Sequence, residues 1–215
     1  MIELSLIQKI IIYAIPIVFA ITVHEVAHGW VANQLGDNTA KRMGRLTLNP
    51  IKHIDPVGTV ILPMLLLYLG GFIFGWAKPV PVNWHNLGKP RRDMALVAAA
   101  GPGANLVMLL IWAILAKLLL MLVADSNLRT IFLMMCSVGI TINIVLMILN
   151  LFPILPLDGG RVMYSLLPKN ISSYYARMEP FGLILIVVLI ASGLFGAILG
   201  PPVNAVQYLV FHVIN

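Results

Sequence analysis

Long stretches of this sequence carry almost no charge, and this feature limits the possible fold more than any other. The run Ile10–Val23 is apolar apart from Tyr13 and Thr22, and Phe181–Leu199 is similar near the other end of the chain. With its flanks, each run approaches the roughly 20 residues that a helix needs to cross a hydrocarbon layer. Of the 215 residues, 60% are hydrophobic and 10% are charged, whereas soluble domains carry about a quarter charged residues. The sequence therefore predicts an all-α, multi-pass membrane protein.

At least four membrane-spanning helices are expected. The clearest cover Leu6–Leu35, Asp93–Val123, Arg129–Leu151 and Ala176–Leu199. The polar residues 125–127 make a tight turn between the second and third helices, so these two form an antiparallel hairpin. The tail, residues 201–215, is short for a crossing and is expected in the membrane interface. No repeat or appended soluble module is visible, so residues 1–215 are expected to form one membrane-embedded domain.

The segment between the first two helices shows the pattern of a small β-loop. Arg45–Asn49 alternates polar and apolar residues, and residues 79–82 alternate Pro and Val. The alternation of Pro and Val indicates an edge strand, and Arg45–Asn49 is the candidate for its partner strand. Pro56–Gly75 lies between them and is interrupted by Pro63 and by glycines at 70–71, which favours a broken segment.

The net charge of +6 is distributed in short runs between apolar segments. This distribution is typical of cytoplasmic loops that face anionic lipid headgroups, and it does not indicate a nucleic-acid-binding surface. The predicted partner of these loops is therefore the lipid bilayer. The two runs are Lys41, Arg42, Arg45 and Lys52, and then Lys89, Arg91 and Arg92.

A metal-binding motif, His24-Glu25-Val26-Ala27-His28, stands near the end of the first helix. Positions i and i+4 share one face of a helix, so both imidazoles can bind one ion, and neutral imidazole suits Zn²⁺. Glu25 lies one step round the helix, where it can act on water rather than bind the metal. A helix that merely ends in polar residues is the simpler reading, but ionisable residues within a membrane segment are by default functional. We therefore interpret the motif as a zinc site.

A catalytic zinc ion needs a third protein ligand, and Asp158 is the best candidate. It lies in the segment 150–160, Asn-Leu-Phe-Pro-Ile-Leu-Pro-Leu-Asp-Gly-Gly, directly after the third helix. The prolines prevent continuation of that helix and the glycines allow a tight turn. A buried lone carboxylate is costly without a cation; alternatively, Asp158 caps a short helix through Leu167. Weaker candidates, in loops or in the tail, are His53, His85 and His212.

Asp158 can reach His24 and His28 only if the first and third helices end on the same side of the membrane. The hairpin contributes two crossings, so we expect Pro56–Gly75 to contribute no net crossing. The basic loops 37–55 and 78–92 would then face the cytoplasm together with residues 161–177.

Together these motifs resemble the site-2 protease family of intramembrane metalloproteases. The resemblance rests on HExxH at 24–28, Asn-x-x-Pro-x-x-Pro-Leu-Asp-Gly at 150–159 and Gly-Pro-Gly-Ala-Asn at 101–105, and it covers roughly residues 22–163. The chain looks most like the short bacterial and archaeal members, which lack a PDZ insertion or a CBS tail. This likeness implies a multi-pass protein of the cell membrane.

The resemblance implies zinc ligands at His24, His28 and Asp158. Glu25 would be the catalytic base, and Asn150 would hold the substrate backbone, with Asn105 also near the substrate. Residues 44–82 would supply a membrane-associated β-loop that presents an extended substrate strand. The implied function is regulated intramembrane proteolysis, in which a zinc metalloendopeptidase hydrolyses peptide bonds of a membrane-spanning protein or peptide.

Two other functions use the same residue types. A metal transporter or metal-binding membrane protein would also place His and Asp inside the membrane, but it gives no reason for Glu25 between the histidines. Internal repeats, which are frequent in transporters, are also not found. An inactive relative that holds membrane clients is the other alternative, and the intact motif argues against it.

Overall fold

The computed structural model describes residues 4–61, 64–65, 68 and 75–214. Within these residues, the helices long and apolar enough to cross a membrane are α1 (Leu6–Gln34), α4 (Pro90–Leu122), α5 (Asn127–Asn150) and α9 (Leu194–Ile214). The shorter elements are α2 (Thr39–Arg42), η1 (Pro50–His53), η2 (Pro56–Ile61), η3 (Trp84–Asn86), α6 (Asp158–Leu166), α7 (Lys169–Ala176) and α8 (Glu179–Ala191). The predicted all-α, multi-pass class is confirmed.

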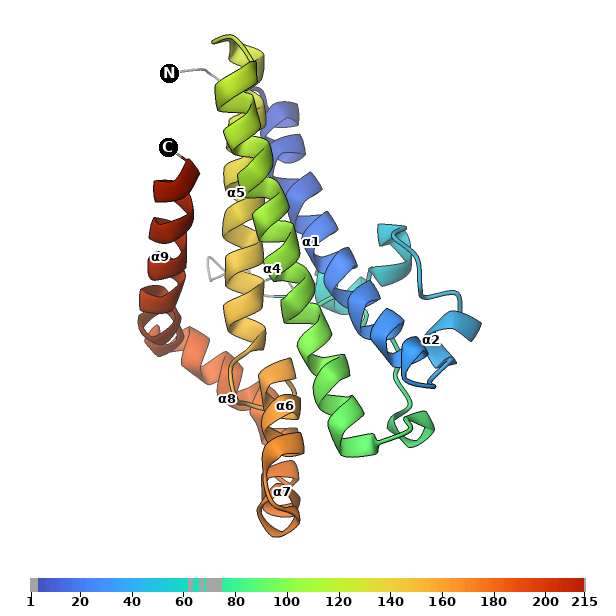
Figure 1. Cartoon of the computed structure of the whole chain (residues 1–215). Coiled ribbons are helices and arrows are strands. Elements are labelled where there is room, and N and C mark those ends of the chain that lie inside the picture. The colour runs from blue at the N-terminus through green and yellow to red at the C-terminus, as the bar shows by residue number, and fades with distance from the viewer. Residues whose placement is uncertain (1–3, 62–63, 66–67, 69–74, 215) are drawn as a thin grey trace.

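The helix α4 is the centre of the bundle and packs against α1, α5, α6 and α9 (Figure 1). Local signals set where its neighbours begin. Ser5 and Gln8 form a capping box at the start of α1, and the Ser126 side chain accepts the Arg129 N–H at the start of α5. Large apolar side chains on the outer faces, such as Ile7 and Leu110, stay exposed, as expected for surfaces that meet lipid.

The fourth spanning helix differs from the one predicted at Ala176–Leu199. Helix α8 ends at Ala191, and Gly193 has a φ of 75°, a left-handed conformation that ends helices readily. The chain then starts α9, which includes most of the predicted interfacial tail and packs against α5. Its last residue, Ile214, is buried in a core with Leu109 and Ile140. The apolar run was continuous in sequence, so only the turn at Gly193 reveals the break.

The predicted β-loop between residues 44 and 82 is wrong for the part of it that the structure describes. Neither Arg45–Asn49 nor residues 79–82 form a strand. Prolines at 79 and 81 have no N–H group, so this stretch cannot form a regular ladder of hydrogen bonds. The remainder of the predicted loop, at 62–63, 66–67 and 69–74, lies outside the described residues.

Isolated hydrogen bonds hold residues 78–83 across the end of α1, and we call these residues the strap. The Lys78 N–H donates to His53 O at 2.9 Å. The Arg45 guanidinium donates to Lys78 O at 2.8 Å and, at 3.3 Å, to the carbonyl of the next residue. Arg45 is 7% exposed, so a buried cation takes the place of the predicted partner strand.

The far end of the strap is bound to Asp37, just beyond α1. Its fully buried carboxylate accepts the Asn83 N–H at 2.7 Å, the Asn86 side-chain amide at 2.9 Å and both donors of Thr39. Burial alone would raise the pKa of Asp37, but these hydrogen bonds lower it below its usual value. The carboxylate therefore stays ionised and fastens the strap to the end of α1.

A backbone hydrogen bond shows the topology of the connection between α1 and α4. Gly88 N–H donates to Leu35 O at 3.3 Å, so the chain returns, directly before α4, to the point where α1 ended. The connection therefore makes no net crossing, and α1 and α5 can end on one side of the bundle (Figure 1). Whether Pro56–Gly75 itself enters and returns depends partly on residues outside the described ranges.

This topology predicts the sides on which single cysteines react with a membrane-impermeant maleimide in sealed vesicles. Arg42→Cys and Lys89→Cys, at exposed positions, should be labelled from one side, and Ser126→Cys in the α4–α5 turn from the other. The native Cys136 is buried and should stay unlabelled. Labelling of Arg42→Cys and Lys89→Cys from opposite sides would contradict the return of the chain to the end of α1.

Candidate metal centre

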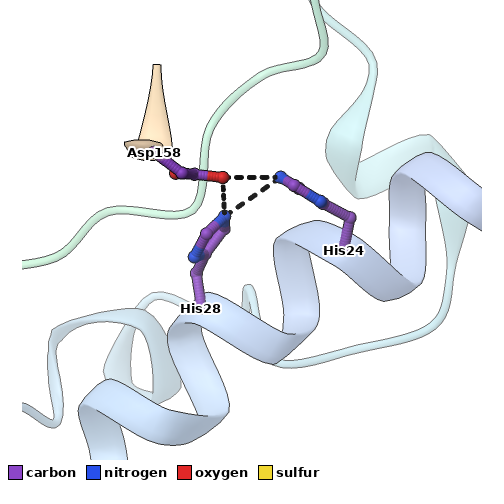
Figure 2. Close-up of side chains that lie close together, drawn as sticks. All are labelled: His24, His28 and Asp158. Atoms are coloured by element: carbon purple, nitrogen blue, oxygen red, sulfur yellow. Dashed lines mark hydrogen bonds and ion pairs between the residues drawn. The ribbon is translucent and has the colours of Figure 1, made fainter. Parts of the chain in front are cut away.

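The side chains of His24, His28 and Asp158 converge on one point between α1 and α6 (Figure 2). The two histidine Nε2 atoms are 3.1 Å apart, and Asp158 Oδ2 lies 3.3 Å from each of them. The three side chains are 10%, 13% and 14% exposed. Among the residues that the structure describes, this is the group of His, Cys, Asp or Glu side chains that could hold a metal ion.

The segment after α5 brings Asp158 to this point. Residues 151–157 turn irregularly, and Asp158 is then the first residue of α6 rather than its N-cap. A Cβ at Gly159 would clash with Leu151 O, and one at Gly160 would lie 2.5 Å from the backbone of the same segment. The two glycines therefore serve close packing of α6 against the segment before it, and both have φ values outside the left-handed region.

The second ring nitrogen of each histidine has its own partner. His28 Nδ1 lies 2.7 Å from Val97 O, and His24 Nδ1 lies 2.6 Å from Asn105 Oδ1. A carbonyl oxygen can only accept, so in the neutral ring Nδ1 carries the proton and Nε2 presents a lone pair. Both Nε2 lone pairs then point toward the site, as in histidines that bind metals.

These three ligand atoms fit a zinc ion. Two imidazole lone pairs and a carboxylate oxygen face one another, and Asp158 Oδ2 is buried without a hydrogen-bond partner. Tetrahedral zinc with bonds of about 2.0–2.1 Å requires ligand atoms roughly 3.3 Å apart, close to the observed 3.1–3.3 Å.

Helix α4 covers the histidine pair at Gly101. A Cβ on this glycine would clash with His28 Nε2 and would lie 2.5 Å from His24 Cε1. The neighbouring Gly103 differs, because a Cβ there would have no atom within 4 Å. Gly101 therefore allows α4 to approach α1 closely at the site.

Glu25 does not join the cluster of ligand atoms but contacts the strap. Its Oε2 accepts the Val80 N–H at 2.8 Å. The Val80 side chain is 7% exposed and packs toward Gly29, where a Cβ would lie 2.6 Å from Val80 Cγ1. One carboxylate oxygen of Glu25 is therefore held by backbone 55 residues away in sequence.

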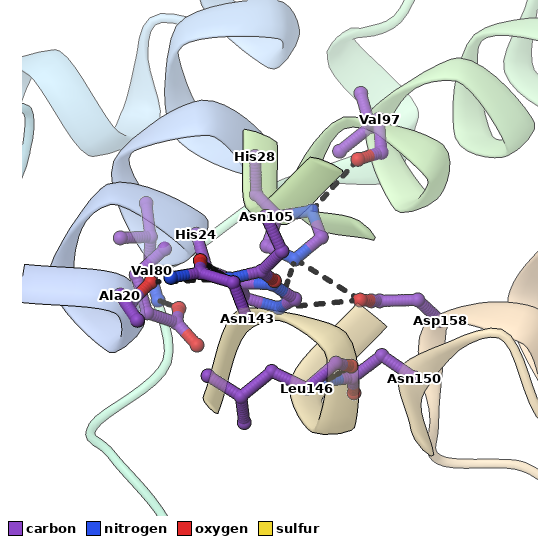
Figure 3. Close-up of polar contacts among 11 residues, drawn as sticks. Ala20, His24, His28, Val80, Val97, Asn105, Asn143, Leu146, Asn150 and Asp158 are labelled. Atoms are coloured by element: carbon purple, nitrogen blue, oxygen red, sulfur yellow. Dashed lines mark hydrogen bonds and ion pairs between the residues drawn. The ribbon is translucent and has the colours of Figure 1, made fainter. Parts of the chain in front are cut away.

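The two predicted asparagines lie at the site in different ways (Figure 3). Asn150 is half-buried, and its side-chain amide donates to Leu146 O at 2.9 Å within α5. Asn105 is fully buried, and it contacts His24. This burial favours a role in positioning His24 over contact with substrate.

Sequence reasoning missed Asn143, a fully buried residue of α5 whose Oδ1 accepts the Asn105 amide at 2.9 Å. Its only signal was an amide within an apolar helix. The other histidines lie apart from the cluster: His53 Nε2 contacts Thr47 O at 2.9 Å, His85 belongs to η3, and His212 stacks on Tyr208.

Comparisons with known proteins find a matching peptidase family model and several similar proteins. Residues 117–192 match the family model of peptidase family M50, and this stretch contains both Asn150 and Asp158. The chain is 41% identical over 197 residues to YwhC, a candidate zinc metalloprotease of Bacillus subtilis (strain 168). That match covers 89% of this chain and 85% of YwhC.

More distant relatives carry a similar description. Rip2, a candidate zinc metalloprotease of Mycolicibacterium smegmatis, is 31% identical over 175 residues, which cover 80% of this chain and 63% of Rip2. Rip2 of Mycobacterium tuberculosis (strain H37Rv) is 28% identical over 170 residues, with 79% and 62% coverage. No solved structure matches the chain significantly.

Substitution of the two α4 glycines should have opposite results. Gly101→Ala should displace the imidazoles and weaken zinc binding by about tenfold or more, because the added methyl overlaps His28. Gly103→Ala is the matched control, and it should bind zinc like the wild type. Zinc affinity would be measured by competition with a chromophoric chelator on detergent-purified protein. Equal affinities for the two variants would show that α4 does not press on the histidine pair.

Proposed function

Because the chain belongs to peptidase family M50, the site-2 protease family, we propose that its catalytic zinc ion is held by His24, His28 and Asp158. The protein is an intramembrane zinc metalloprotease, consistent with its four candidate membrane spans. The observation that carries the assignment of the ligands is the convergence of three lone-pair atoms within 3.3 Å of one another. Such a group is stable only with a cation among its members.

Glu25 is the general base in this proposal. Zinc supplies a Lewis acid that polarises a peptide carbonyl and makes water more acidic. Glu25 Oε1 receives the proton of the attacking water and passes it to the leaving amine. The Val80 N–H holds Oε2 at 2.8 Å, which orients the carboxylate and leaves the other oxygen for proton transfer.

In this proposal Asn150 holds the substrate backbone. It ends α5, eight residues before Asp158 in the sequence, and both residues belong to the group drawn in Figure 3. Its amide nitrogen is used within the helix, so Oδ1 would accept an N–H of the substrate. The substrate would be a membrane-spanning protein or peptide of the cell membrane. Its helix must unwind locally to expose a peptide bond, which favours helix-weakening residues near the cut.

A metal transporter is the second candidate. It would use the same three ligands, but it would not require a carboxylate between the histidines that is held in place by a backbone N–H. The contact between Glu25 and the strap therefore favours the protease.

The Glu25→Gln variant should bind zinc but fail to cleave a purified reporter transmembrane substrate. Glutamine can still accept the Val80 N–H through its Oε1, so the fold should persist, but it cannot take up a proton. Loss of a general base lowers cleavage by about 10²–10⁴-fold. Bound zinc and product would be quantified for the same preparation. Unchanged cleavage would refute Glu25 as the base, and zinc flux without any cleavage by wild type would favour the transporter.

Val80→Pro should lower the cleavage rate by about tenfold, or about 1.4 kcal/mol of activation free energy, while zinc stays bound. Proline lacks the N–H that holds Glu25. Val80→Ala is the matched control, since it removes similar packing against Gly29 but keeps the N–H. The comparison is of turnover and zinc content in the two variants. A faster Val80→Pro enzyme would mean that the contact restrains Glu25 instead of orienting it for the reaction.

A further inference from the structure

Three amide and imidazole side chains form a continuous line across the three central helices (Figure 3). His24 Nδ1 in α1 lies 2.6 Å from Asn105 Oδ1 in α4, and Asn105 Nδ2 lies 2.9 Å from Asn143 Oδ1 in α5. Asn143 Nδ2 then lies 2.8 Å from Gly139 O. Both asparagines are 0% exposed, so neither amide is in contact with bulk water.

The line has a single direction, which its last acceptor decides. Gly139 O can only accept, so the Asn143 amide nitrogen points to it and Asn143 Oδ1 points to Asn105. The Asn105 nitrogen must then face Asn143, and its oxygen must face His24. A second observation agrees: Asn105 Nδ2 also lies 3.5 Å from Ala20 O, another atom that can only accept.

The orientation of the Asn105 amide decides the tautomer of His24, the proposed zinc ligand. An Asn105 oxygen facing His24 Nδ1 places the proton on that nitrogen and leaves the lone pair on Nε2. His28 needs no such help, because Val97 O is a backbone atom with a fixed role. His24 is thus the ligand whose tautomer depends on side chains, since an amide that rotated by 180° would present NH₂ to Nδ1 and favour the wrong tautomer.

We infer that Asn143 is a positioning residue of the metal centre, which acts on His24 through Asn105. Buried amides also join membrane helices without any further role. Asn143 differs from such residues because its hydrogen-bond partner, Asn105, contacts the ring of His24, a proposed zinc ligand. This inference rests on the proposed role of His24 as a zinc ligand.

The test compares two hydrogen bonds made by α5. Asn143→Leu removes the line with little change in volume. Thr141→Val is the matched control, because Thr141 Oγ1 accepts from Gln207 of α9 at 3.1 Å, two residues away and apart from the metal ligands. The readouts are the zinc dissociation constant, from chelator competition, and the d–d absorption bands of the Co²⁺-substituted protein, which report ligand geometry.

Asn143→Leu should weaken zinc binding by about tenfold and shift the Co²⁺ bands, whereas Thr141→Val should change neither. Asn143→Asp should lie closer to the wild type, because a neutral buried carboxyl can donate to Gly139 O and accept from Asn105. In a double-mutant cycle with Asn105→Leu, the double variant should bind zinc no more weakly than Asn105→Leu alone.

Three results would overturn the inference: an Asn143→Leu affinity equal to that of Thr141→Val, an Asn143→Asp affinity equal to that of Asn143→Leu, or additive effects in the cycle. His24→Ala separates this failure from failure of the proposed function. If His24→Ala binds zinc like the wild type, the ligand assignment itself is wrong. If it loses zinc while Asn143→Leu does not, only the role of Asn143 is wrong.

Discussion

The convergence of two imidazoles and one carboxylate is the constraint on which the rest of this structure depends. Two imidazoles and one carboxylate converge within 3.3 Å inside a helical bundle, an arrangement that costs free energy unless a cation joins it. The requirement that they meet explains why α1 and α5 end together, why the chain between α1 and α4 returns to its starting point, and why the segment after α5 is irregular.

Close approach of the helices is the second requirement, and small residues provide it. Gly101 admits α4 over the histidine pair, and Gly159 and Gly160 let α6 pack on the segment that carries Asp158. Without a hydrophobic force between helices in lipid, such contacts and buried hydrogen bonds hold a bundle together. In this protein the same contacts position His24, His28 and Asp158, so the packing of the helices and the geometry of this cluster depend on the same few residues.

The connection between α1 and α4 has a functional part as well as a topological one. Arg45, His53 and Asp37 hold the strap at its two ends, and its middle residue, Val80, contacts Glu25. The Glu25 carboxylate, the proposed base, is therefore oriented from outside the helix that carries it. The prediction of strands in the described part of this region was wrong. Alternating Pro and Val occur in irregular segments with few backbone N–H donors as well as in edge strands.

By itself the sequence determined the features that depend on short spacings: the spanning helices α1, α4 and α5, the two histidines on one helical face, and an irregular segment ending in a carboxylate. Only the tertiary structure decided the break at Gly193, the path of the strap and the line from Asn143 to His24. These depend on contacts between residues 38 to 81 positions apart, or on one backbone angle. A local pattern records which side chains share a face, whereas the partner of a buried amide is chosen by how the helices pack.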